Sequence, residues 1–213
     1  MERQVASWLR MRGRALRLFA PASLVLAGWL AFAGSEPSSA QAQTSGARFE
    51  GVATCAGSTC HGRSEGNGAI VRQDEIASGQ DPSSASGAHS RAYSVLASRR
   101  GRQIAQSLGL GAATSAPACL GCHATYVPQS RRGARFHTSD GVGCESCHGA
   151  AEGWLQVHYE KGASHASNVR AGLVPLQDPK MRAKVCLDCH YGSTKTGQFV
   201  THSMMAAGHP RIS

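Results

Sequence analysis

The feature that most constrains what this chain can fold into is a short phrase, Cys-x-x-Cys-His, which the sequence contains three times. Two thiols at this spacing can add to the two vinyl groups of one haem, while the adjacent imidazole turns back to bind the iron. The phrase occurs as "CLGCH" (Cys119, Cys122, His123), "CESCH" (Cys144, Cys147, His148) and "CLDCH" (Cys186, Cys189, His190).

An earlier phrase, "CAGSTCH", places Cys55, Cys60 and His61 in the same order with two more residues between the cysteines. The wider loop can still bring both sulfurs to one porphyrin edge, so we interpret it as a fourth motif. The four motifs use all 8 cysteines. With 10 histidines in 213 residues, a histidine follows a given cysteine by chance about one time in twenty, so four in four indicates haem attachment.

Two other uses of the cysteines compete with this interpretation. Disulfides suit an exported protein, and "CLGC" with "CESC" could form a four-thiolate zinc site. Neither gives the four histidines a role. We therefore predict four haem c groups per chain, attached through the eight cysteines and bound on one side by His61, His123, His148 and His190.

Residues 1–42 are predicted to be an export signal. Five arginines precede a short apolar run, and "AQA" at Ala40–Ala42 offers small residues for cleavage. The apolar run is about 17 residues, close to the lower limit for spanning a bilayer, so an uncleaved membrane anchor is the alternative. We expect a periplasmic protein with a polar linker at 43–50 and a tetrahaem domain at 51–213.

The composition bears on both partner and fold. The formal net charge is +9, but the aromatic content is only 6% and the basic residues are dispersed, so we expect no nucleic-acid partner. Large apolar residues are sparse and glycines number 25, which is too little material for an ordinary core. We expect the haems to form the core.

The expected fold is mostly α, with short helices and long loops. Apolar residues at helical spacing predict a helix within 90–108, ended by Gly109. Asp178 followed by Pro179 predicts the start of a helix that carries the last motif at its C-terminal end. A short helix is expected at "WLQVHYE", and no alternating pattern indicates a sheet.

The chain resembles the tetrahaem cytochromes c of the c-554 type. The resemblance runs over nearly all of the predicted mature part, most specifically "GVGCESCHG", the histidine nine residues beyond it, and "AHSRAY". It implies a mainly helical fold with closely stacked haems. The wider first motif departs from the family, and the chain stops four residues after His209, where we would expect more polypeptide.

Six histidines remain as second axial ligands. The resemblance implies His89 and His158 as two of them, and His209 in "AAGHP" follows because the proline fixes the backbone after it. His202 and His165 compete for the fourth place, and His137, in an arginine-rich loop, is the weakest candidate. Met204 and Met205 are expected to pack rather than to bind iron.

We expect an electron carrier that exchanges single electrons with redox partner proteins, because ten histidines suffice to close four irons. The alternative is a haem enzyme with one open iron acting on nitric oxide, nitrite or hydroxylamine. We would then expect the open iron at the second motif, which Arg131, Arg132 and Arg135 follow. A third possibility is a haem-bearing subunit of a larger membrane complex.

Overall fold

The computed structural model describes residues 46–211. The predicted export signal and the first part of the predicted linker lie outside the described residues. All the described residues belong to one compact unit, Gln43–Ser213. No helix within 46–211 is long and apolar enough to cross a bilayer.

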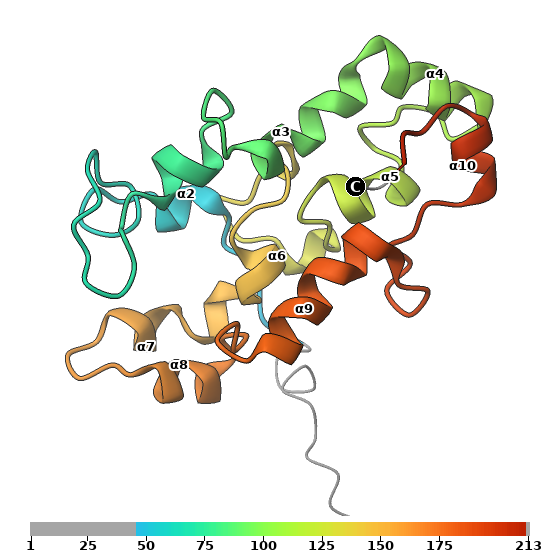
Figure 1. Ribbon diagram of the computed structural model, residues 1–213. Helices are drawn as coiled ribbons and strands as arrows, with labels where there is room; N and C mark the ends of the chain where they lie inside the picture. Colours follow the sequence, from blue (N-terminus) through green and yellow to red (C-terminus); the bar gives the residue numbers. More distant parts are fainter. Residues whose placement is uncertain (1–45, 212–213) are drawn as a thin grey trace, which may run out of the picture. The chain divides into compact units, whose positions relative to one another are not determined.

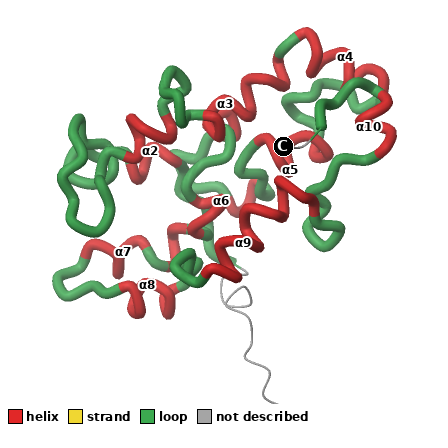
Figure 2. Tube along the Cα trace, viewed as in Figure 1, coloured by secondary structure: helices red, strands yellow, loops and turns green. Residues whose placement is uncertain are grey.

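The described residues form short helices joined by long loops, which confirms the expected mostly α fold (Figures 1 and 2). No strand occurs between residues 46 and 211, where pairing is limited to isolated bridges such as Phe49 with Arg132. The α-helices are α2 (Val52–Cys55), α3 (Ala88–Ser94), α4 (Arg99–Ser107), α5 (Pro117–His123), α6 (Glu145–His148), α7 (Leu155–Tyr159), α8 (His165–Ala171), α9 (Pro179–Leu187) and α10 (His202–Ala206). The 3-10 and π turns are η2 (Ile76–Gln80), η3 (Val95–Ala97), η4 (Gln129–Arg131), η5 (Thr138–Asp140), η6 (Ala151–Gly153) and η7 (Asp188–Gly192).

The helix expected within 90–108 is divided in the structure. α3 and η3 end at Ser98, whose backbone is extended and whose hydroxyl accepts a hydrogen bond from Gly101 N to start α4. Serine is a preferred N-cap because its side chain satisfies a free N–H of the first turn. The continuous apolar pattern concealed this break.

The other two expected helices are confirmed. The Asp178 side chain accepts a hydrogen bond from Lys180 N, with Pro179 at the first helical position of α9. The chain then continues into η7, which contains Cys189 and His190. "WLQVHYE" contains α7.

The protein core is small and is built largely from alanine. Between residues 46 and 211, no large side chain is fully buried, and the main cluster joins Leu96 and Leu120 to three alanines. This cluster holds η3, α4 and α5 together. Outside this cluster, the buried apolar residues between 46 and 211 are Ala116, Val127, Ala150, Ala151 and Trp154.

A buried carboxylate anchors the third motif. Glu145, inside "CESCH", is 5% exposed. Its oxygens accept hydrogen bonds from the backbone N–H groups of Glu50 (2.9 Å), Gly51 (2.7 Å) and Ala151 (2.7 Å). One side chain therefore fixes the start of the described chain to the segments on both sides of α6.

Gly141 brings the third motif against α3. Its φ is +75°, and a Cβ at this position would lie 2.5 Å from the carbonyl oxygen of His89. The next residue, Val142, donates its N–H to that same carbonyl at 3.0 Å. Only glycine permits both the left-handed backbone and the close approach.

Candidate haem-binding site

Three pairs of histidine rings face one another across nearly equal gaps. The ring centres of His61 and His158 are 6.1 Å apart, those of His89 and His190 6.1 Å, and those of His123 and His209 6.2 Å. Each pair joins one histidine of a Cys-His motif to one distant histidine. The distant members are His158, His89 and His209, the three that headed the candidates from the sequence.

These gaps fit one iron between two imidazoles. Two iron–nitrogen bonds of about 2 Å, plus about 1.2 Å from each nitrogen to its ring centre, give about 6.3 Å. Ring centres about 4.5–7 Å apart are also found in ordinary aromatic pairs. What favours a shared iron is that every pair joins a motif histidine to a distant one at nearly the same separation. The histidine pairs therefore fit the axial ligands of haem.

Hydrogen bonds at Nδ1 orient the rings of the first pair. His61 Nδ1 lies 2.8 Å from Glu75 Oε2. His158 Nδ1 lies 3.3 Å from the side-chain amide nitrogen of Asn168, whose buried Oδ1 has no partner. Turning this amide over would let Oδ1 accept the Nδ1 proton. Both rings would then present an unprotonated Nε2, which is what a metal requires.

The rings of the His123–His209 pair are held by backbone carbonyls. His123 Nδ1 donates to Ala92 O, 2.7 Å away in α3. His209 Nδ1 donates to the carbonyl of Pro210 at 2.7 Å. Arg100 of α4 also donates to Gly208 O at 2.8 Å, which ties the segment before His209 to the helical core. Again Nε2 is the nitrogen left for a metal.

His148 differs from the other motif histidines. Among residues 46–211, no histidine ring makes a ring pair with it. It lies close enough to His61 and His158 for their charges to affect it, and burial followed by these two charges lowers its pKa. Within the described residues, the motif whose histidine faces no second histidine is therefore the third, whereas the enzyme alternative placed an open iron at the second, where His209 faces His123.

Partial desolvation lowers the pKa values of His148 and His158 below the ordinary histidine value, with nearby His61 adding to the effect in both, although both residues keep exposed surface. A metal binds only the neutral imidazole. The environment therefore favours iron ligation over a charged histidine.

The cysteines place the four motifs in a spatial series. The thiols of Cys55 and Cys144 share a hydrogen bond, which raises the pKa of Cys55 and lowers that of Cys144. The thiols of Cys122 and Cys189 share a second hydrogen bond, which raises the pKa of Cys189 and lowers that of Cys122. Burial, and next the charge of Cys186, raise the pKa of Cys147. The first motif therefore neighbours the third, the third neighbours the fourth, and the fourth neighbours the second.

The thiols lie in these contacts between motifs and not in a four-thiolate group. Within the described part of the chain, all eight cysteines are free, and no three side chains of His, Cys, Asp or Glu are grouped to hold a metal ion. A haem motif needs only one iron ligand from its own segment, so it does not require such a group.

Two buried polar atoms lack partners near the first motif. Trp154 is 6% exposed, its Nε1 has no acceptor, and its ring meets that of His158 edge-on at 5.6 Å. Arg63, two residues after His61, has a buried Nε without an acceptor. Buried donors are normally satisfied. Haem propionates would supply acceptors for both.

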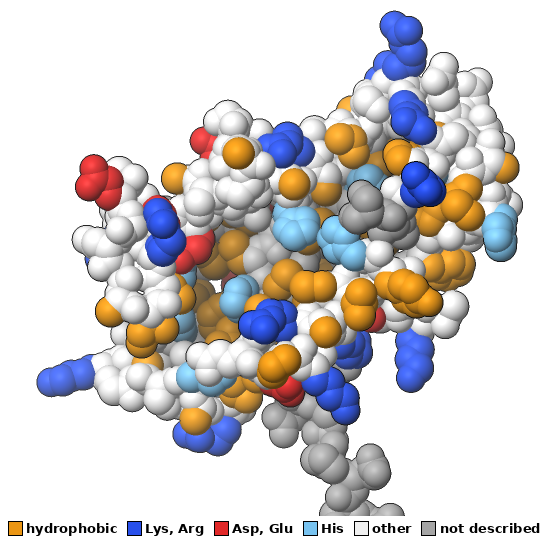
Figure 3. Space-filling view, in the orientation of Figure 1, with side chains coloured by type: hydrophobic (Ala, Val, Ile, Leu, Met, Phe, Trp, Pro, Cys, Tyr) orange, Lys and Arg blue, Asp and Glu red, His pale blue; other side chains and the backbone are white. Residues whose placement is uncertain are grey.

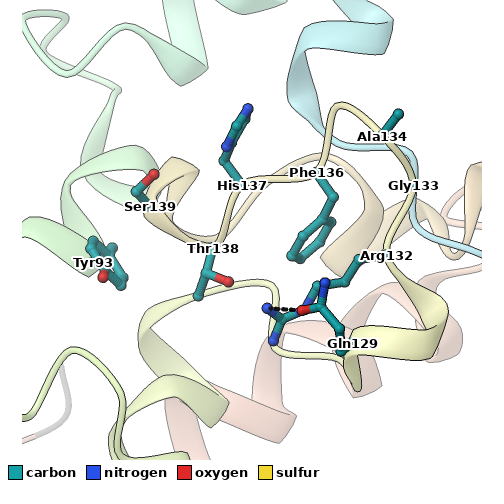
Figure 4. A pocket seen from close by; sticks show the side chains of 9 residues that line it. All are labelled: Tyr93, Gln129, Arg132, Gly133, Ala134, Phe136, His137, Thr138 and Ser139. Carbon is teal, nitrogen blue, oxygen red and sulfur yellow. Dashed lines mark hydrogen bonds between the residues drawn. The ribbon is translucent and has the colours of Figure 1, made fainter.

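The remaining histidines lie apart from the pairs. His165 and His202 are exposed at the first residues of α8 and α10, and neither ring faces another histidine. His137 is also exposed and lines an open pocket of about 650 Å³, in which Arg132 donates to Gln129 and lies over the ring of Phe136 (Figure 4). No cysteine and no paired histidine lines this pocket.

Several residues of the site could not be found from the sequence. Glu75 and Asn168 face Nδ1 atoms of histidines 14 and 10 residues away in the chain, and Ala92 acts through its carbonyl. None of these lies in a motif. Only Glu145, inside "CESCH", lay within a recognised phrase, and no spacing rule assigned it a role.

Comparison with known proteins gives one match. Residues 82–149 match the family model described as "Cytochrome c554 and c-prime". The matched segment holds the second and third motifs together with α3, which carries His89. No curated protein and no solved structure matched the chain.

Proposed function

We propose that this chain is a periplasmic multihaem c-type cytochrome that transfers single electrons between redox partner proteins, with haem c at each of its four motifs. The observation that carries the proposal is the set of three histidine pairs at 6.1–6.2 Å. The match of residues 82–149 to a cytochrome family supports it. Haem c, when bound, supplies an iron that gains or loses one electron.

The residues around the paired rings suit electron transfer and not substrate binding. Two histidines on one iron leave no open position. Glu75, Ala92 and Pro210 hold the rings through Nδ1, so the ligands need not move between oxidation states. The spatial series of first, third, fourth and second motifs supports transfer between neighbouring centres along the molecule.

Mass spectrometry and redox titration of the exported protein test this proposal. The expected mass is that of the chain cut near Ala42 plus four haems, with reversible one-electron steps in the titration. A mass with only three haems, and with Cys55 and Cys60 as free thiols, would show that the first motif binds no haem. If the protein is found in the membrane fraction with Met1 still present, the leader is an uncleaved anchor and the carrier is attached to the membrane.

A second candidate is a haem enzyme that acts on nitric oxide, nitrite or hydroxylamine at the third motif. It is favoured by one observation, the lack of a second histidine opposite His148 within the described residues. Addition of nitric oxide to the reduced protein and cyanide to the oxidised protein tests it. Stoichiometric binding to one haem with turnover would favour the enzyme, whereas binding without turnover would leave the carrier.

A further inference from the structure

Within residues 46–211, the acidic residues are confined to two stretches of the sequence. Residues 82–139 and 189–211 contain nine Arg and Lys and no Asp or Glu, a formal charge of +9. Residues 46–81 and 140–188 contain eight Arg and Lys and eleven Asp and Glu, a formal charge of −3. We call these the basic part and the acidic part. The basic residues alone look dispersed, and the asymmetry comes from where carboxylates are missing.

The two stretches of the basic part are joined in space. Gln198 donates to the carbonyl of Gly121 in α5 at 2.8 Å, and Arg100 of α4 donates to Gly208 O. The second motif meets its distant histidine here, because His123 ends α5 and His209 follows α10. The second motif also stands at one end of the spatial series of motifs.

The acidic part surrounds the opposite end of that series. Glu75 contacts His61 of the first motif, and Asp74 lies next to it, paired with Arg72. Glu152 is paired with Arg48 near the start of the described chain. The 131–135 loop of the basic part also lies at this end, because Arg131 donates to Ala47 O and Gly133 N donates to Phe49 O. The difference in charge between the two ends therefore rests on the arginines of α4 and on the acidic residues near His61.

Helix α4 concentrates the exposed charge of the basic part. Arg99, Arg100 and Arg102 are exposed and have no carboxylate partner within residues 46–211. The face in Figure 3 shows Lys and Arg side chains and no Asp or Glu over α4 and α10. Val95, in η3 before α4, and Met205 in α10 are 47% and 43% exposed. Apolar side chains with a charged rim are typical of protein interfaces.

We propose that α4 and α10 form a docking surface for an acidic redox protein, which exchanges electrons at the second motif. This inference rests on the proposed carrier function. A lipid surface or a nucleic acid would also meet the positive charge, but neither exchanges electrons with the site that His123 and His209 form. Opposite charges on two proteins speed their encounter and set their relative orientation, and this attraction weakens as the salt concentration rises.

The test compares two double variants of the holoprotein with equal charge change. Arg99→Glu with Arg102→Glu reverses two charges on α4, on residues three apart and hence neighbours on the helix surface. Lys161→Glu with Arg170→Glu is the matched control, since both side chains are exposed in the acidic part and have no bond to another residue. Arg100 is left unchanged because it holds the segment before His209.

The probe is flavodoxin, an acidic one-electron carrier. Its affinity is measured by calorimetry with the oxidised protein, and its rate of haem reduction by stopped flow, both at low and high salt. We expect the α4 variant to lose about tenfold or more in affinity and rate at low salt, the control to change by less than about twofold, and the three proteins to converge at high salt.

Equal losses in both variants would show a net-charge effect and overturn the docking surface, as would no loss in the α4 variant. Binding of the unchanged protein to phosphatidylglycerol vesicles but not to flavodoxin would replace the protein partner by a membrane surface. Haem content and reversible titration of the same samples separate the two proposals. If those measurements fail, the carrier function falls, and if they hold, only the docking surface is at stake.

Discussion

Glu75 is the side chain most directly placed to adjust one iron, because its carboxylate faces Nδ1 of His61 at 2.8 Å. A negative acceptor draws the Nδ1 proton, makes the imidazole a stronger donor and stabilises ferric iron. Glu75→Gln keeps an acceptor but removes the charge, so one midpoint potential is expected to rise. Spectroelectrochemical titration measures this change.

Glu65→Gln is the matched control for Glu75. Glu65 is exposed and makes no side-chain contact among residues 46–211, so its substitution is expected to leave every midpoint unchanged. Similar shifts in both variants would mean that the overall charge, and not the contact with His61, sets the potential.

Glu145 is expected to matter for stability. Glu145→Ala leaves three N–H groups without acceptors, so the free energy of unfolding should fall by on the order of 3 kcal/mol, measured by thermal unfolding.

The same residue should make stability depend on pH. Burial raises the pKa of Glu145 despite these bonds, so its carboxyl group binds a proton more tightly in the folded protein than in the unfolded chain. The free energy of unfolding should therefore fall as pH rises from the ordinary pKa of glutamate to the raised pKa of Glu145. The Glu145→Ala variant should not show this dependence on pH.

At the scale of elements, the start of α9 depends on one cap. Asp178→Ala removes the acceptor for Lys180 N, and the free energy of unfolding should fall by about 1 kcal/mol. Hydrogen exchange in α9 should quicken first, because the cap acts on the first turn. Lys180→Ala, at the second residue of the same helix, keeps the capped backbone N–H and removes only an exposed charge, so it should change neither quantity. A comparable loss there would point to solvent-exposed charge as the cause.

The contact between α3 and the third motif depends on Gly141. Gly141→Ala adds backbone strain of about 1–2 kcal/mol and a clash with His89 O, so α3 should shift and the His89–His190 pair should loosen. The expected result is loss of one low-spin signal in electron paramagnetic resonance. Gly162→Ala has the same strain, with φ at +86°, but open space around the new Cβ. Its signals should remain intact, and loss of a signal in both variants would contradict a local role for Gly141.

For the whole molecule, the pairing predicts the spin states of the oxidised holoprotein. Three irons between two histidines should be low-spin, and the iron on His148 should be high-spin. The rings of His61 and His158 are 15° apart, whereas those of the other pairs are 62° and 79° apart. Near-parallel imidazoles give a rhombic low-spin signal and near-perpendicular ones a signal with a large maximal g value. The spectrum should show one of the first kind and two of the second, and four low-spin signals would contradict an open iron at His148.

The sequence by itself carries the prediction of haem attachment at the four motifs. Each Cys-His motif acts within five to seven neighbouring residues, so local spacing is enough to predict it, and so are the caps at Asp178 and the expected absence of strands. The sequence also ranked His89, His158 and His209 above the other distant histidines, partly through a family resemblance, and these are the three that face motif histidines in the structure.

Only the tertiary structure decided which distant histidine meets which motif, because loop closure over 86 to 101 residues leaves no local signal. For the same reason the sequence did not indicate that His148 of the third motif faces no second histidine within the described residues, and it did not find Glu75 or Asn168. The charge asymmetry also depends partly on the sequence and partly on the tertiary structure. The absence of carboxylates between Asp81 and Asp140 can be counted in the sequence, but only the contact of α4 with the segment before His209 brings the α4 arginines to one end of the motif series.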